Sequence, residues 1–160
     1  MTIKLSAQPL YEQDFNLWLE TMANLLKENR LDEIDLENLA EEIKSINHKD
    51  QGTIRENLVI ILIHLLKWKY QPEIWSNNWR TMIDQSRKKI YHCIRQSPSL
   101  QEYLRQVLDK SYDHARQMTA IETKASLETF PETNPFAEDE ILDRTFLPDG
   151  FFPQYYEDYN

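Results

Sequence analysis

The sequence predicts an all-α fold: a compact bundle of about five main helices, with a C-terminal tail rich in proline and aromatic residues packed across it. Two observations support this prediction. Apolar residues recur at steps of three and four along most of the chain, which is the period of an amphipathic helix. The chain also has only two glycines among its 160 residues, too few for a fold built on hairpin turns that need positive φ. A chain of this length can bury a sizeable core as one domain.

The first two helices are predicted over residues 11–29 and 35–46. Each has an apolar side whose members are mostly three or four residues apart. Those members are Phe15, Trp18, Met22, Leu25 and Leu26 in the first helix, and Leu36, Leu39, Ala40, Ile43 and Ile46 in the second. Asp35 can cap the second helix. Residues 47–52 end in a glycine and predict a turn, which would allow the second and third helices to pair antiparallel.

The third helix, predicted over 53–70, is the most apolar segment of the chain. Little of its circumference is polar, which is typical of a central helix with neighbours on several sides. Gln71-Pro72 ends it, because the residue before proline avoids the helical region. The longest apolar run, LVIILI at 58–63, is far shorter than the ~20 residues that span a bilayer, so we expect no membrane span.

The fourth and fifth helices are predicted over 79–96 and 100–124. Residues 76–78 can cap the fourth helix, and Ser97-Pro98-Ser99 separates the two. Ser99 and Glu102 fit the S-x-x-E pattern of a capping box, which predicts that the fifth helix begins near Leu100.

The remainder of the chain is a proline-rich tail. We predict one helical domain over residues 1–149, in which residues 126–149 pack on the helices because large apolar residues recur there. Asn134-Pro135 can start a short helix that runs through Leu142, since proline suits the first helical position. Residues 150–160 are expected to fray.

Charge is distributed unevenly along this acidic chain, whose formal net charge is −9. Residues 1–125 are nearly neutral, whereas residues 126–160 hold nine acidic residues and one basic residue. Within the first part, residues 11–50 are acidic and residues 80–95 are basic. We expect these helices to complement each other or to face water. The acidic total argues against nonspecific nucleic-acid binding, although one basic face can act locally.

Composition also limits the class of protein. Two glycines cannot build the glycine-rich loops of P-loop or dinucleotide-binding proteins. The N-terminal residues contain no apolar stretch that resembles a signal peptide. The lone cysteine, Cys93, cannot form an intramolecular disulfide, which suits a reducing compartment. We therefore expect a cytoplasmic protein.

Two glutamates and a histidine are candidate binding residues: Glu41, Glu42 and His64. Carboxylates and histidines on facing helices can hold a metal, but the diagnostic Glu-x-x-His pair is missing. Under the antiparallel pairing, Glu42 lies level with Leu58, and His64 lies ~9 Å further along the axis. We therefore predict no metal ligands and no cofactor.

Lys67 is a fourth candidate binding residue, and it lies on one stripe of the third helix with His64 and Gln71. This stripe is either a polar groove or the exposed edge of a buried helix, with the lysine stem covering apolar surface. Under the antiparallel pairing, Lys67 comes level with the acidic residues of the first interhelical turn, Asp32, Glu33 and Asp35. We expect an ion pair there.

The last candidates follow the third helix. Trp75 and Trp79 are either an exposed aromatic anchor for a partner protein or a lid on the end of the core, and we favour the lid. Arg87, together with Lys88 and Lys89, is a candidate phosphate contact, although no nucleic-acid motif is present. We predict no catalytic residue, because Cys93 and the adjacent His92 point about 100° apart on a helix.

Several segments resemble, in their joint order, the bacterial domain-of-unknown-function family twenty-nine. They are YEQDFNLW (11–18), LAEEI (39–43), HLLKWKYQP (64–72), Trp79 with Ile83 and Arg87, SPSL (97–100), Tyr112 with Ala115, Glu122-Thr123, FPETNPF (130–136) and ILDRTFLP (141–148). The resemblance implies a compact all-helical domain to which the proline-rich tail belongs, and it implies no reaction. Among the matched polar residues are Glu41, Glu42, His64, Lys67 and Arg87. A fixed network of these residues that joins helices is one expectation.

We expect a non-enzymatic helical module that binds another protein, on the basis of the separated charges and the Trp75–Trp79 loop. One alternative is a metal- or small-molecule-dependent enzyme with a polar site between helices. The other is a nucleic-acid binder that uses the basic fourth helix. The oligomeric state stays open.

Overall fold

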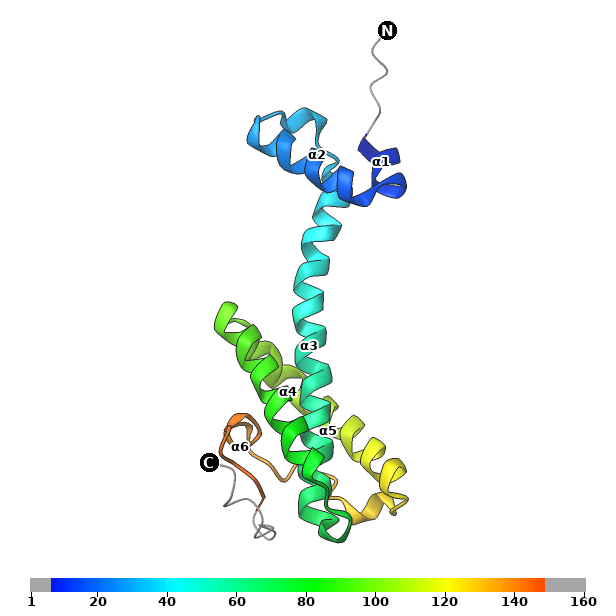
Figure 1. The fold of residues 1–160 in the computed structure, drawn as a ribbon, viewed down its shortest axis with the longest axis vertical. Helices are drawn as coiled ribbons and strands as arrows, with labels where there is room; N and C mark the ends of the chain where they lie inside the picture. Colours follow the sequence, from blue (N-terminus) through cyan, green and yellow to red (C-terminus); the bar gives the residue numbers. More distant parts are fainter. Residues whose placement is uncertain (1–6, 149–160) are drawn as a thin grey trace. The chain divides into compact units, whose positions relative to one another are not determined.

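The computed structural model describes residues 7–148 and has an all-α fold, which confirms the predicted fold class (Figure 1). The described residues form no strand. The end expected to fray, residues 150–160, lies outside them. In chain order the elements are α1 (Ala7–Gln13), α2 (Phe15–Lys27), η1 (Leu31–Glu33), α3 (Leu36–Tyr70), η2 (Pro72–Ile74), α4 (Asn77–Gln96), α5 (Leu100–Thr123), η3 (Leu127–Thr129) and α6 (Glu138–Leu142), where η marks a 3-10 helix.

The chain divides into two compact units, Met1–Lys49 (unit 1) and Asp50–Asn160 (unit 2). Each unit has its own buried core. In unit 1 the core is Trp18, Met22 and Leu25, and the residues packed against it are Leu10, Tyr11, Ile34 and Leu39. In unit 2 a larger core joins α3, α4 and α5 with the segment that follows them. Helix α3 therefore supplies residues to both cores.

The turn predicted at residues 47–52 is wrong, because α3 continues through it. Gly52 lies inside this helix, and nothing lies within 4 Å of the position that a Cβ would take there. One glycine costs a helix about 1 kcal/mol, and no proline interrupts the segment, so its polar residues suit an exposed helix as well as a turn. The predicted antiparallel pair of helices does not exist.

The apolar side predicted for residues 35–46 consequently has no paired helix to cover it. Leu36, Ile43 and Ile46 are 67%, 61% and 65% exposed. Leu39 alone on that side packs against the core of unit 1. Asp35 caps α3 as predicted, since its carboxylate accepts a hydrogen bond from the backbone N–H of Asn38 at 3.4 Å.

The single helix predicted over residues 11–29 is also wrong, because the structure forms two helices there. Asp14 separates α1 from α2, and its carboxylate accepts a hydrogen bond from the backbone N–H of Leu17 at 3.0 Å. This is the geometry of an N-cap, whose own backbone is not helical. Asn29, with φ of 57°, follows the end of α2 in the left-handed region.

The helices of unit 2 follow the prediction more closely. From Ile54 onward α3 is central, as predicted, and Ile54, Leu58 and Ile61 are fully buried. Helix α4 begins two residues earlier than predicted and is capped by Ser76. Helix α5 begins at Leu100 as predicted, but the capping box is wrong, because the Ser99 side chain makes no capping hydrogen bond.

The segment after α5 contributes three buried side chains to the core of unit 2, namely Phe130, Phe136 and Ile141. Helix α6 begins at Glu138, three residues after the predicted start at Pro135. The Glu140 carboxylate accepts a hydrogen bond from the backbone N–H of Ala137 at 2.9 Å, which fixes the start of this short helix. Within residues 7–148, no helix combines the length and hydropathy needed to cross a membrane.

Candidate functional site

The seven predicted binding residues belong to both units. Glu41 and Glu42 lie in unit 1, whereas the other five lie in unit 2. Within unit 2, each of those five side chains makes contacts of its own.

In unit 1, Glu42 joins two helices. The Tyr11 hydroxyl of α1 donates a hydrogen bond to the Glu42 carboxylate of α3. This hydrogen bond is the main cause of the raised pKa of Tyr11. Glu41 instead forms a surface ion pair with Lys44 at 3.0 Å. Sequence reasoning missed a second tie in this unit, in which the buried Trp18 indole donates to the Asp35 carboxylate at 3.3 Å.

In unit 2, His64 and Lys67 bond to different partners. The His64 Nδ1 lies 2.7 Å from the backbone oxygen of Ile60, and burial is the main cause of the lowered pKa of His64. The Lys67 ammonium pairs with Glu122 of α5. The prediction of an ion pair with the acidic turn before α3 is wrong, because it depended on the antiparallel pairing. Lys67 instead ties α3 to α5.

Arg87 has the most fully satisfied polar side chain of the seven. It is 2% exposed and donates three hydrogen bonds to backbone oxygens: Nε to Ile141 at 2.8 Å, Nη1 to Phe146 at 2.8 Å and Nη2 to Glu140 at 2.9 Å. Burial lowers the pKa of Arg87 to about 10. The guanidinium holds the segment around α6 against α4, so its donors point into unit 2 rather than to a phosphate.

Trp75 and Trp79 both pack against Trp68 of α3. The Trp75 ring meets it edge-on at 6.2 Å between centroids, and the Trp79 ring lies at 6.5 Å. Trp79 is 6% exposed and Trp75 is half-buried. Most of the Trp79 ring is therefore covered by unit 2 itself, in the arrangement described above as a lid.

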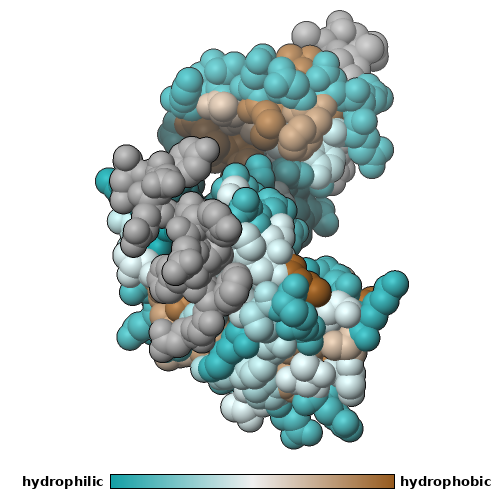
Figure 2. All heavy atoms as spheres, turned by 60° about the horizontal axis from the view of Figure 1, so that its bottom comes forward, coloured by the Kyte–Doolittle hydropathy of each residue, from teal (hydrophilic) through white to brown (hydrophobic). Residues whose placement is uncertain are grey.

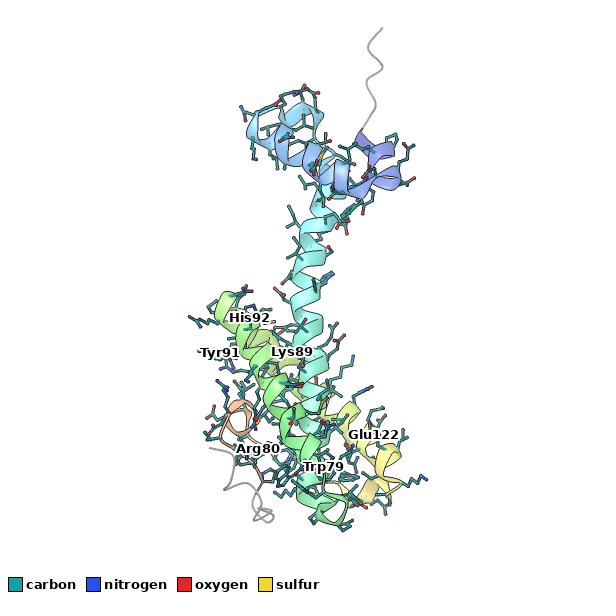
Figure 3. The ribbon with its side chains drawn as sticks, viewed as in Figure 1. Trp79, Arg80, Lys89, Tyr91, His92 and Glu122 are labelled. Atoms are coloured by element: carbon teal, nitrogen blue, oxygen red, sulfur yellow. The ribbon has the colours of Figure 1, made fainter. Side chains whose placement is uncertain are left out.

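The basic residues next to Arg87 face solvent. Lys88, Lys89 and Arg95 of α4 are exposed, and they form no ion pair with a residue between 7 and 148. Figure 3 labels Lys89 with Tyr91 and His92 on the second half of this helix. Tyr91 and His92 are exposed too, so this face of α4 is cationic with one aromatic ring.

No three His, Cys, Asp or Glu side chains in the described part of the chain are placed to hold a metal ion. Burial is the main cause of the raised pKa of Cys93, which favours the neutral thiol. Cys93 is buried and the neighbouring His92 is exposed, so the two side chains face different surroundings.

The largest unexplained feature of the structure is apolar surface on unit 1. Among the described residues, eight of the twelve large exposed apolar side chains belong to this smaller unit: Phe15, Leu17, Leu19, Leu26, Leu31, Leu36, Ile43 and Ile46. Figure 2 shows brown residues gathered on one face of it. Scattered exposed apolar residues are ordinary, but a gathered group marks an interaction surface. We call these eight side chains together the unit 1 apolar surface, although Leu17 points about 160° away from Leu19 on α2 and does not share a face with it.

Sequence reasoning missed this surface for a physical reason. The apolar sides of the first two predicted helices included five of these residues: Phe15, Leu26, Leu36, Ile43 and Ile46. Periodicity shows which side of a helix is apolar and does not show whether a neighbour covers it. One signal was present in α2, where Leu17 and Leu19 make the helix apolar beyond the side that its core uses.

Comparison with known proteins gives one match. A family model described as "Domain of unknown function DUF29" matches residues 10–147. No curated protein and no solved structure matches the chain.

Proposed function

Because the chain belongs to the DUF29 family, whose description names no activity, we propose its function from its surface: a non-enzymatic helical module that binds another protein. The observation that carries this proposal is the unit 1 apolar surface. Helix α2 buries Trp18, Met22 and Leu25 on one side. Phe15, Leu19 and Leu26 lie beside that side and extend the apolar face of the helix into solvent.

Covering the unit 1 apolar surface would release a free energy comparable to the cost of association. Fully burying one leucine or isoleucine side chain contributes roughly 1.5–3 kcal/mol. The eight side chains are each between 40% and 70% exposed, so covering all of them releases roughly 6–13 kcal/mol before the costs of association. Association itself costs about 4–15 kcal/mol, so the buried area supports binding but does not set the affinity.

The proposed class of function is the one predicted from the sequence, but the proposed contact surface lies in unit 1 instead of the Trp75–Trp79 loop. The Trp75–Trp79 loop was one of the two grounds for that prediction, but its rings pack on Trp68 of the same unit. The exposed aromatic ring that replaces them is Phe15, which stacks on Trp18 at 5.7 Å and meets Tyr11 edge-on at 5.6 Å. A ring fixed by two others loses little freedom on binding, which is typical of interface anchors.

Affinity capture from source-cell lysate with matched variants tests the proposal. The double variant Leu19→Asp, Leu26→Asp places two charges in the unit 1 apolar surface. Ile121→Asp makes the same change at an exposed position of unit 2. We expect wild type and Ile121→Asp to retain a protein that the double variant loses, with nuclease making no difference. A protein retained equally by all three, or none retained by wild type, would contradict the proposal.

A second candidate function has one supporting observation. Lys88, Lys89 and Arg95 are exposed and have no ion-pair partner among residues 7–148, so they could contact the phosphates of a nucleic acid, with Tyr91 available to stack on a base. Arg87 does not belong to this group, because three backbone oxygens occupy its donors. A mobility shift at low salt that weakens in Lys88→Glu, Lys89→Glu would support it, and no shift with DNA or RNA would dispose of it.

A further inference from the structure

The exposed apolar side chains of α2 form a narrow stripe. At 100° per residue, Phe15, Leu19 and Leu26 point within about 40° of one another. They extend over twelve residues, a rise of roughly 16 Å along the helix. The core side of the same helix, formed by Trp18, Met22 and Leu25, lies next to this stripe. A straight apolar stripe of about three turns matches the apolar side of another helix better than it matches a loop or a small molecule.

Helix α3 carries a second stripe of the same kind within unit 1. Leu36, Leu39, Ile43 and Ile46 follow one another at steps of three, four and three. These are the spacings of the seam along which two helices pack side by side. Three of the four are more than 60% exposed. Both stripes of unit 1 therefore have the spacing that a helical partner recognises.

The net charge of unit 1 indicates which charge a helical partner should carry. Residues 7–49 hold ten acidic side chains and four basic ones. Two of the basic side chains are already paired within the unit: Arg30 bonds to Glu28 and Glu33, and Lys44 bonds to Glu41. Unit 1 is thus acidic on balance, and we call the exposed Glu20 and Glu37, which follow Leu19 and Leu36 in the sequence, the acidic rim of the apolar surface. Like charges brought together across an interface cost affinity.

A second copy of the chain fits this surface poorly. Two units of the same negative charge would repel each other. The seam on α3 covers only two heptads before Asp50 takes the next seam position, whereas stable two-stranded coiled coils usually need three or four. A partner with basic residues beside its apolar stripe meets both requirements, since its charge complements the rim.

From these observations we propose that unit 1 binds a basic amphipathic helix of a partner protein. The partner's apolar side covers Phe15, Leu19 and Leu26, and its lysine or arginine side chains lie against the acidic rim. This proposal rests on the proposed function and narrows it to one class of partner.

The test uses the full chain and three labelled synthetic peptides of eighteen residues. The first has leucine at helical spacing and lysine elsewhere. The second has the same composition with the leucines scattered around the helix. The third has the leucine pattern of the first with glutamate in place of lysine. Fluorescence anisotropy measures binding of each peptide to wild type, to Leu19→Asp, Leu26→Asp and to Ile121→Asp.

We expect the leucine–lysine peptide to bind wild type and Ile121→Asp with equal affinity, and the double variant roughly tenfold or more weakly. Its affinity falls between 50 and 500 mM salt, because salt screens the acidic rim. The scattered and acidic peptides bind at least about tenfold more weakly than the first.

Four results would overturn the proposal: equal binding of the acidic peptide, equal binding of the scattered peptide, equal weakening by Ile121→Asp, or dimerisation of the free chain in sedimentation velocity that the double variant abolishes. The last result would make a second copy the occupant. If lysate capture still depends on Leu19 and Leu26 while the leucine–lysine peptide does not bind, the protein-binding function stands and this partner class is wrong.

Discussion

Arg87 places a positive charge inside unit 2, and the structure explains why the unit tolerates it. A buried charge is costly unless hydrogen bonds replace the lost water. The three backbone oxygens that accept from Arg87 come from residues 53 to 59 positions away in the chain. The side chain therefore fastens a distant segment of the chain, and its contribution is structural.

Replacing Arg87 with methionine should lower the free energy of unfolding of unit 2. The change leaves three carbonyl oxygens without donors, and a hydrogen bond to a charged group contributes about 1.5–3 kcal/mol, so we expect a loss on the order of 3 kcal/mol or more. Chemical denaturation measures it, and hydrogen exchange should increase across residues 138–142. Lys88→Met, at the exposed neighbouring position, serves as the control. A loss below about 0.5 kcal/mol in Arg87→Met would contradict the assigned role.

His64 should make the stability of unit 2 depend on pH. Its pKa in the folded chain is lowered, chiefly by burial, so below the ordinary value of about 6.5 the unfolded chain binds a proton that the folded chain does not. Stability is then full above pH 6.5 and decreases as the pH falls through that value. The His64→Gln variant should lose this decrease between pH 7.5 and 5.5, whereas His92→Gln, at an exposed position, should keep it. The measurement is the denaturation midpoint of wild type and of both variants at each pH.

At the scale of single residues, the sequence was a better guide to which polar side chains form important contacts than to the partners of those contacts. The Asp35 cap was predictable, because its partner lies three residues away. Lys67 was correctly expected to form an ion pair, but its partner, Glu122, lies 55 residues away. A local sequence pattern does not show which residues far along the chain will be neighbours in the fold. The role of Arg87 was unpredictable for the same reason.

Among the elements, α3 is the one that the sequence described least well, and Gly52 is the cause. A glycine after a polar run is a common turn signal, yet here it lies inside a helix of 35 residues. The helix boundaries of unit 2 were predicted more closely, because proline or a capping serine bounds its helices at residues 72, 76 and 98. Boundaries enforced by local chemistry could be predicted, whereas the absence of a boundary could not.

The Gly52→Ala variant distinguishes a continuous helix from a turn. Alanine is favoured over glycine inside a helix by about 0.8–1 kcal/mol, and the space around the new Cβ is open, so we expect stabilisation of roughly that amount. Thermal or denaturant unfolding measures it, with Gln51→Ala as the comparison for an ordinary helix position. A turn that needs positive φ at residue 52 would instead make the alanine variant less stable.

For the whole molecule, the balance of exposed apolar area between the two units is the main finding. The smaller unit carries most of the large exposed apolar side chains of residues 7–148, and none of them is among the three buried residues of its core. A surface of this composition is the basis of the proposed protein-binding function. The fold class followed from periodicity, but exposure depends on which helices meet, and only the structure provides that.

The unit 1 apolar surface should be separable from folding. Leu19→Asp, Leu26→Asp changes two exposed side chains, and substitutions at such positions usually alter stability by less than about 0.5 kcal/mol each. We expect a melting curve close to that of wild type. Trp18→Ala, in the core beneath this surface, should by contrast cost about 3–5 kcal/mol. Equal destabilisation by both changes would mean that the surface belongs to the core.

The most direct test of the central claim is site-specific photo-crosslinking in the source cells. A photoreactive amino acid replaces Leu26 in one strain and Ile121 in another, and crosslinked products are separated by mass and identified. The account predicts a product with a second protein from position 26 and none from position 121. Crosslinks of equal yield from both positions, or none from position 26, would contradict the claim that unit 1 carries the binding surface.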